Sequence, residues 1–188
     1  MRIISGNFKG KKILLPKDKL TRPLKDLTKE SIFNILKHSK LLNIELESSN
    51  VLDLFSGVGS FGLECLSRGA KNVTFLESYK EVLNILKKNI DNLNQQNQTK
   101  VIEKDIFSEN TLKLLNDKFD IIFMDPPYKE KKLSFLLNTI TELKLLNTGG
   151  IVIIHRHKKE EDNLPKVFNL IVEKNYGISK IIFGNILT

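Results

Sequence analysis

Residues 53–62 read DLFSGVGSFG, and this stretch decides the fold. It follows an apolar, β-rich run that begins at Val51, so it is predicted to turn the first strand of a sheet into the first helix. Its three glycines match the dinucleotide-binding pattern G-x-G-x-x-G, and Glu77 lies 20 residues after the first of them, at the end of the next apolar run. Taken alone, the pattern indicates an NAD site.

Short apolar runs alternate with helix-period segments in much of the chain. Five of these runs are predicted strands, at residues 51–55, 73–76, 101–102, 121–124 and 151–154. Strands that alternate with helices need right-handed crossovers, so they favour a mainly parallel sheet covered on both faces. Two more runs, at 167–172 and 178–183, have no helix-length segment between them and predict an antiparallel hairpin. We therefore predict an α/β, three-layer, Rossmann-like sandwich with a mostly parallel seven-stranded sheet that ends in an antiparallel pair.

The composition is typical of one folded domain, because the chain has 188 residues of which 40% are hydrophobic and 28% charged. No apolar stretch approaches the ~20 residues that span a bilayer, and the N-terminus has no apolar signal segment. A single cysteine excludes an internal disulfide framework and a cysteine-only zinc site. We expect a cytoplasmic, monomeric protein with no membrane partner and no bound metal.

The net charge of +8 comes from the start of the chain. Residues 1–40 hold 11 Lys and Arg against 3 Asp and Glu, whereas residues 41–188 are balanced. A segregated basic segment suits a polyanion, because neutralised phosphates release counterions. We predict a basic hairpin and helix at 1–40 that extends a sheet domain at 41–188. The candidate nucleic-acid contacts are Lys9, Lys11, Lys12 and Arg22.

Three acids close three successive predicted strands around the glycine turn. Asp53 would place a carboxylate against the pyrophosphate of NAD, which needs bare backbone N–H groups. S-adenosylmethionine carries no phosphate, and an acid attracts its ammonium and its sulfonium. Glu77 can accept hydrogen bonds from ribose hydroxyls and Asp105 from an adenine amine, although each acid could instead cap the following helix. The residues predicted to bind this cofactor are Asp53, Phe55, Ser56, Gly57, Gly59, Glu77, Asp105 and Ile106.

Residues 125–128, Asp-Pro-Pro-Tyr, follow the fourth predicted strand directly. Two prolines fix φ and remove two N–H donors, so this turn is stiff and presents carbonyl oxygens. Asp125 and the Pro126 carbonyl can accept both hydrogens of a planar amino group, while Tyr128 stacks on the ring that carries it. An amine held in line with a sulfonium methyl group needs mainly orientation to react. The predicted catalytic residues are Asp125, Pro126, Pro127 and Tyr128.

The chain resembles class I amino-methyltransferases in its D-x-F-x-G-x-G and Asp-Pro-Pro-Tyr motifs. The stretches RIISGNFKG at 2–10, TRPLKD at 21–26 and KESIFN at 29–34 make it similar to the RsmD family. That resemblance extends nearly end to end. It implies a class I methyltransferase fold, S-adenosylmethionine as cofactor, and methylation of a guanine N2 amine in 16S ribosomal RNA within a small-subunit particle. Leu24 stands where the family has a threonine, and Leu27 replaces a basic residue common in the family.

Two other functions compete with this one. Asp-Pro-Pro-Tyr also occurs in DNA adenine and cytosine amino-methyltransferases, but the residues after Tyr128 must complete the sheet and leave no room for a target-recognition domain. A non-catalytic RNA-binding or ribosome-assembly protein could keep the fold, although binding alone requires none of these acids. His155 and His157 are expected in a polar loop after the fifth strand, and no general base is evident.

Overall fold

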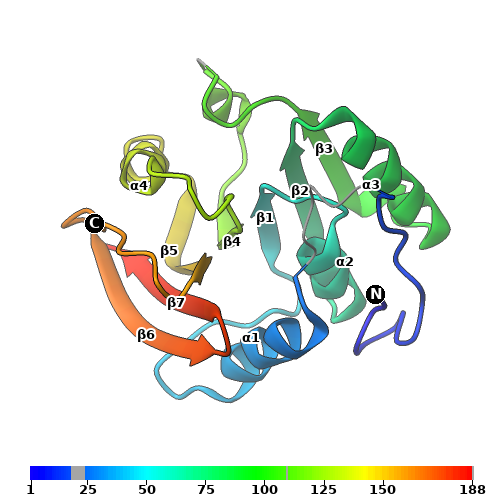
Figure 1. The fold of residues 1–188 in the computed structure, drawn as a ribbon, viewed down its shortest axis with the longest axis horizontal. Helices are drawn as coiled ribbons and strands as arrows, with labels where there is room; N and C mark the ends of the chain where they lie inside the picture. Colours follow the sequence, from blue (N-terminus) through cyan, green and yellow to red (C-terminus); the bar gives the residue numbers. More distant parts are fainter. Residues whose placement is uncertain (18–23, 109, 188) are drawn as a thin grey trace.

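The computed structural model describes residues 1–17, 24–108 and 110–187, which form one seven-stranded sheet with helices on both faces (Figure 1). The strand order is β3-β2-β1-β4-β5-β7-β6, with β1 to β5 parallel and β7 antiparallel to both of its neighbours. The strands are β1 Asn50–Leu54, β2 Asn72–Glu77, β3 Thr99–Glu103, β4 Phe119–Met124, β5 Leu146–His157, β6 Phe168–Tyr176 and β7 Ser179–Ile186. The predicted parallel sheet and antiparallel hairpin are both confirmed.

The strand order reverses at β1, which lies between β2 and β4. From β1 the chain moves outward to β2 and β3, and then returns to β4 and β5 on the other side. In the register of β1 and β4, Leu54 pairs with Met124, so the loops that follow the two strands begin side by side. Ligands of open α/β sheets bind in the crevice at such a switch point.

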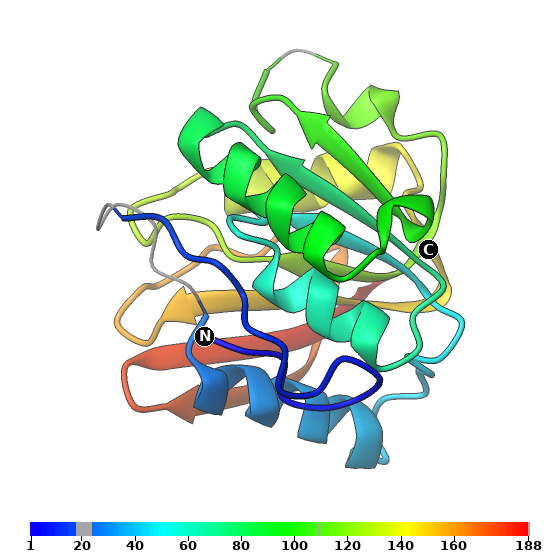
Figure 2. The same ribbon diagram turned by 90° about the vertical axis from the view of Figure 1, so that its right-hand side faces the viewer.

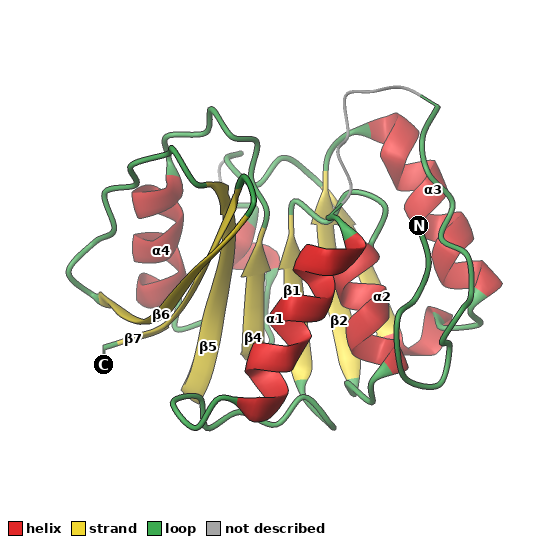
Figure 3. Ribbon diagram, turned by 60° about the horizontal axis from the view of Figure 1, so that its bottom comes forward, coloured by secondary structure: helices red, strands yellow, loops and turns green. Residues whose placement is uncertain are grey.

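Two hydrophobic cores lie on opposite faces of the sheet. Helices α1 Asp26–His38, α2 Ser60–Ser67 and α3 Lys80–Asn92 contribute to one core, and α4 Leu133–Glu142 contributes to the other. Figure 3 shows α1 and α2 in front of the central strands. In the described part of the segment from β3 to β4, a short 3-10 turn, Leu112–Leu114, replaces the helix that strict alternation would supply. None of the helices in the described ranges is long and apolar enough to cross a membrane.

The N-terminal segment, residues 1–17, packs on α2 and then passes beside α3 (Figure 2). The expected hairpin is reduced to an isolated bridge between Arg2 and Lys12. Ile3 and Ile13 are nonetheless buried in the same core as α1, in which Ile32, Phe33 and Leu36 are buried as their spacing predicts. The basic segment is therefore built into the sheet domain through apolar contacts.

Candidate active site

A cavity of about 820 Å³ opens at the carboxyl ends of the central strands. Its volume lies within the ~300–1,000 Å³ usual for small-molecule sites. One side is formed by the loops after β1, β2 and β3, and the other by the loop after β4, the end of β5 and the start of β7. Phe61 and Phe123 also line the cavity and stack on one another, with ring centroids 4.0 Å apart. The cavity therefore spans the point where the strand order reverses.

The glycine turn uses its own N–H groups. The Gly57 N–H donates to Glu77 Oε2 at 2.8 Å, and the Gly62 N–H donates to Asp53 Oδ2 at 3.0 Å. The Gly59 N–H donates to a backbone carbonyl within the turn. Pyrophosphate binding at such a turn requires N–H groups that point at the ligand. The three glycine N–H groups are thus used within the protein, two of them to hold carboxylates in place, and these carboxylates disfavour the pyrophosphate of NAD on charge.

The conformation of the turn explains two of its residues. Gly59 has φ +83°, and a Cβ there would lie 2.5 Å from Leu86 Cδ1, so both backbone and packing favour glycine. Phe55 has φ 60°, an uncommon conformation for a bulky residue. Phe55 lines the cavity, and the centroid of its ring lies 6.0 Å from that of Phe107. The strained turn therefore presents an aromatic wall to the cavity.

The described lining of the cavity is strongly acidic. It holds the carboxylates of Asp53, Glu77, Asp105, Asp125 and Glu130, against the single ammonium of Lys25. Asp53 is only 1% exposed, and burial raises the pKa of its carboxyl well above the usual value. The Gly62 N–H opposes this rise, while the Asp125 and Glu77 carboxylates add to it. These residues fit S-adenosylmethionine, because its ammonium and sulfonium would offset the charge that the carboxylates concentrate.

The loop after β4 carries Asp125 at the wall of the cavity, with its side chain 21% exposed. Pro126 is buried and Pro127 exposed, so the rigid dipeptide is anchored at one end. The ring of Tyr128 also lines the cavity and meets the ring of His157 edge to face, with centroids 5.3 Å apart. The structure therefore brings the acid, the prolines and the aromatic ring together at one rim.

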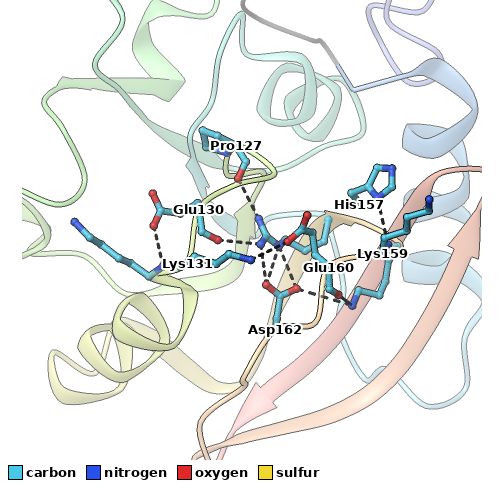
Figure 4. Close-up of polar contacts among 10 residues, drawn as sticks. Pro127, Glu130, Lys131, His157, Lys159, Glu160 and Asp162 are labelled. Atoms are coloured by element: carbon cyan, nitrogen blue, oxygen red, sulfur yellow. Dashed lines mark hydrogen bonds and ion pairs between the residues drawn. The ribbon is translucent and has the colours of Figure 1, made fainter.

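A fully buried arginine holds this loop, and its partners Pro127, Glu130 and Asp162 are labelled in Figure 4. Arg156 of β5 donates through Nη1 to the Pro127 carbonyl at 3.1 Å and through Nη2 to the Glu130 carbonyl at 2.9 Å. Its charge is paired with Asp162, whose Oδ1 lies 2.8 Å from Nη2. Because the guanidinium is planar and bonded through all three of its nitrogens, it fixes the backbone of the loop on both sides of Tyr128.

The expectation of a polar loop at His155 is wrong. His155 belongs to β5 and is only 6% exposed, because the apolar run at 151–154 continues as one long strand past this residue. Its Nδ1 lies 2.7 Å from Asp125 Oδ1 and its Nε2 lies 2.9 Å from Ser179 Oγ. The only signal in the sequence is that His155 follows a predicted strand, as Asp125 does. His157 also lies in β5, as its last residue.

This chain is similar to known proteins over nearly its whole length. The family model described as "Conserved hypothetical protein 95" matches residues 1–185. The ribosomal RNA small subunit methyltransferase D of Haemophilus influenzae is 32% identical over 183 residues, which are 95% of this chain and 90% of that protein. Its namesake in Buchnera aphidicola is 34% identical over 92% of this chain and 86% of that protein.

The chain belongs to the RsmD family. The solved structure of HI0767 from Haemophilus influenzae is 31% identical and superposes with a TM-score of 0.77, covering 100% of this chain and 99% of that chain. That of yhhF from Escherichia coli is 25% identical, with a TM-score of 0.81 over 100% of this chain and 98% of that chain. The predicted class I methyltransferase sandwich is thus confirmed, and the chain is a methyltransferase by family and by fold.

In this RsmD-family protein, most of the predicted site residues line one cavity. They are Asp53, Phe55, Ser56, Gly57, Glu77, Asp105, Asp125, Pro126, Pro127 and Tyr128. Gly59 and the buried Ile106 are not among the described residues that line it. Sequence reasoning missed other residues of the lining, among them Lys25, Glu130, His155, Ile178 and Ser179.

The structure does not bring the predicted nucleic-acid contacts to the cavity. Lys9, Lys11 and Lys12 are exposed in a loop that hydrogen-bonds to Ser67, at the carboxyl end of α2. The cavity lies at the other end of that helix, where Ser60 lines it. Arg22 lies outside the described residues. The described chain holds no cluster of three or more His, Cys, Asp and Glu side chains that could bind a metal ion.

Proposed function

We propose that this methyltransferase transfers a methyl group from S-adenosylmethionine to the exocyclic N2 amine of a guanine in small-subunit (16S) ribosomal RNA. The observation that carries the proposal is that Asp53 and Asp125, from the ends of β1 and β4, line the same cavity. An acidic pocket for a cationic cofactor thereby adjoins an acceptor site for an amine. Relatives that cover nearly the whole chain are named ribosomal RNA small subunit methyltransferase D.

The cofactor would lie among the loops after β1, β2 and β3, which contribute Asp53, Glu77 and Asp105 to the cavity. Glu77 is already oriented by N–H groups: its Oε1 accepts those of Ser78 and Tyr79, and its Oε2 accepts that of Gly57. Oε2 therefore retains a lone pair for a ribose hydroxyl. When bound, S-adenosylmethionine supplies an electrophilic methyl group on a sulfonium. The protein would hold that methyl group in one orientation and exclude cofactors that carry phosphate.

The target amine would be held by Asp125 and the Pro126 carbonyl, with Tyr128 against the face of the base. Among the hydrogen bonds of the described residues, the Pro127 carbonyl accepts from both Arg156 and the Glu130 N–H, and the Pro126 carbonyl accepts none. The Pro126 oxygen is thus the one left for a ligand. Acceptors on both amine hydrogens direct the nitrogen lone pair away from the protein, toward the methyl group.

The substrate would be a folded RNA with one base splayed into the cavity. Lys9, Lys11 and Lys12 lie one helix length from the cavity, about 12 Å for the eight residues of α2. They would therefore contact phosphates outside the base pocket, which favours recognition of an extended RNA surface over recognition of a single nucleotide.

The test is methylation of small ribosomal subunits that lack the modification, with labelled S-adenosylmethionine, followed by mapping of the labelled base. We expect label on the N2 of one guanine, and far less on free duplex DNA. Label confined to duplex DNA, or on another atom of the base, would contradict the proposed substrate. If calorimetry shows no binding of S-adenosylmethionine, the proposed reaction is wrong and a non-catalytic role in ribosome assembly is favoured.

Asp125→Ala tests the acceptor site, with Asp117→Ala as the matched control. Asp117 is an exposed aspartate that does not line this cavity. We expect Asp125→Ala to lower turnover by about 100-fold or more, since orientation of the amine is lost. The affinity for S-adenosylmethionine should stay within about threefold of the wild-type value, because its predicted contacts are on the other side of the cavity. Wild-type turnover in Asp125→Ala would refute the assignment.

A further inference from the structure

His155 connects the two elements that form the amine side of the cavity. It lies one residue beyond the pair Met124 and Ile154, so its side chain neighbours that of Asp125 at the end of β4. Its ring also reaches Ser179, the first residue of β7. Nδ1 lies 2.7 Å from Asp125 Oδ1 and Nε2 lies 2.9 Å from Ser179 Oγ, which are both short hydrogen-bond distances.

For an ionised aspartate and a neutral imidazole, the chemistry of the three groups assigns the protons. An ionised aspartate has no hydrogen to give, so the imidazole must donate to Asp125 through Nδ1–H. The Nε2 atom of a neutral ring is then an acceptor, and the only hydrogen available to it from Ser179 is that of the hydroxyl. The chain of hydrogen bonds runs from Ser179 through His155 to Asp125. Each bond of such a chain polarises the next, so the two bonds support one another.

This series of hydrogen bonds restricts the orientation of the Asp125 carboxylate. With Oδ1 occupied by His155, Oδ2 is the oxygen left to accept a hydrogen from a ligand in the cavity. The side chains of His155 and Asp125 are 8% and 21% exposed, so water competes little for the bond between them. Free rotation of the Asp125 carboxylate would otherwise have to be lost each time an amine is bound.

We infer that His155 is a positioning residue of this methyltransferase: it fixes Asp125 for the target amine, and Ser179 fixes the tautomer of His155. The inference rests on the proposed function, because it assigns Asp125 to the acceptor site. It explains why a histidine occupies a strand position whose neighbours in β5 are buried. The alternative is that His155 only joins β4 to β7 through its hydrogen bonds. A pair of substitutions separates the two roles.

His155→Asn keeps a nitrogen at the position of Nδ1 and removes Nε2, whereas His155→Gln keeps a nitrogen near Nε2 and removes Nδ1. Each variant loses one hydrogen bond, so both should unfold at similar temperatures. With modification-free small subunits as substrate, we expect His155→Asn to keep kcat within about threefold and His155→Gln to lower it about 10–100-fold, with KM for RNA and for S-adenosylmethionine little changed. Equal losses of kcat in the two variants, or no loss in His155→Gln, would overturn the positioning role.

A second measurement uses no RNA. Two-bond ¹H–¹⁵N correlation spectra of the free protein report which nitrogen of each of its three histidines carries the proton. We expect His155 to be protonated on Nδ1 and bare on Nε2, and to lose this preference in Asp125→Ala. A proton on Nε2 with a bare Nδ1 would overturn the inference. If wild-type protein fails to methylate ribosomal RNA, the proposed function fails, whereas the tautomer still decides whether His155 holds Asp125.

Discussion

Glu64 offers a sharp test of how the N-terminal segment is held. Its carboxylate is fully buried in α2 and accepts the Ile4 N–H at 2.8 Å, the Ser5 N–H at 3.0 Å and Arg68 Nε at 2.8 Å. The equally buried ammonium of Lys29 lies 3.4 Å away. Burial lowers the pKa of Lys29, and the Glu64 charge opposes that shift. One carboxylate thus connects the start of the chain, α1 and α2.

The perturbation is Glu64→Gln, which preserves shape but removes the charge and replaces one acceptor oxygen with a donor. It removes the nearest counter-charge of the buried Lys29 and, whichever way the amide turns, leaves at least one of the two backbone N–H groups without an acceptor. Breaking a buried ion pair in this way costs about 3–5 kcal/mol. For a chain of this length, where each kcal/mol shifts Tm by about 2–4 °C, the expected fall in Tm is about 6–20 °C.

The assay is thermal unfolding followed by circular dichroism, with limited proteolysis of the folded state. Glu45→Gln is the control, because Glu45 is exposed. We expect proteases to cut within residues 1–17 of the Glu64 variant under conditions that leave the control intact. Adding Lys29→Met should recover part of the lost Tm, since the unpaired buried ammonium is then gone. A Tm of Glu64→Gln within 2 °C of the control would refute the reasoning, because it corresponds to a loss of about 1 kcal/mol or less in the free energy of unfolding.

Three other predictions follow from the cavity and its supports. Burial raises the folded-state pKa of Asp53, so its carboxyl lowers the free energy of unfolding as pH rises through that pKa. Asp53→Asn should therefore melt at a higher temperature than the wild type at pH 8 and lose this advantage toward pH 4. The same variant should bind S-adenosylmethionine more weakly in calorimetry. Gly59→Ala should cost about 1–3 kcal/mol in urea unfolding, and more than Gly149→Ala, which has a similar φ of +80° but nothing within 4 Å of its Cβ. Arg156→Lys cannot span the two loop carbonyls and the carboxylate, so it should lower kcat by about tenfold or more in the methylation assay, with the affinity for S-adenosylmethionine unchanged.

The amino-acid sequence alone was enough to predict the sheet, the glycine turn and the acids that follow four of its strands. Apolar runs, helical spacing and turn residues are local signals, and parallel strands bring their carboxyl ends to one edge. Acids placed just after strands are therefore predicted to meet, and Asp53, Glu77, Asp105 and Asp125 do line one cavity. The two prolines after Asp125 marked a rigid acceptor turn for the same local reason.

Only the tertiary structure revealed the supports of that site. His155, the partner of Asp125, lies 30 residues further along the chain, and Ser179 lies 24 residues beyond His155. Both contacts depend on the register of β5 against β4 and β7. A shift of one residue would turn His155 to the opposite face, and the continuous apolar run at 151–154 does not encode that choice, because both faces of the sheet are covered. The path of residues 1–17 likewise carries the basic loop to the far end of α2, because Glu64 and Ser67 capture backbone N–H groups there. Local periodicity specifies elements, whereas partners for buried polar groups are selected by packing across the whole sheet.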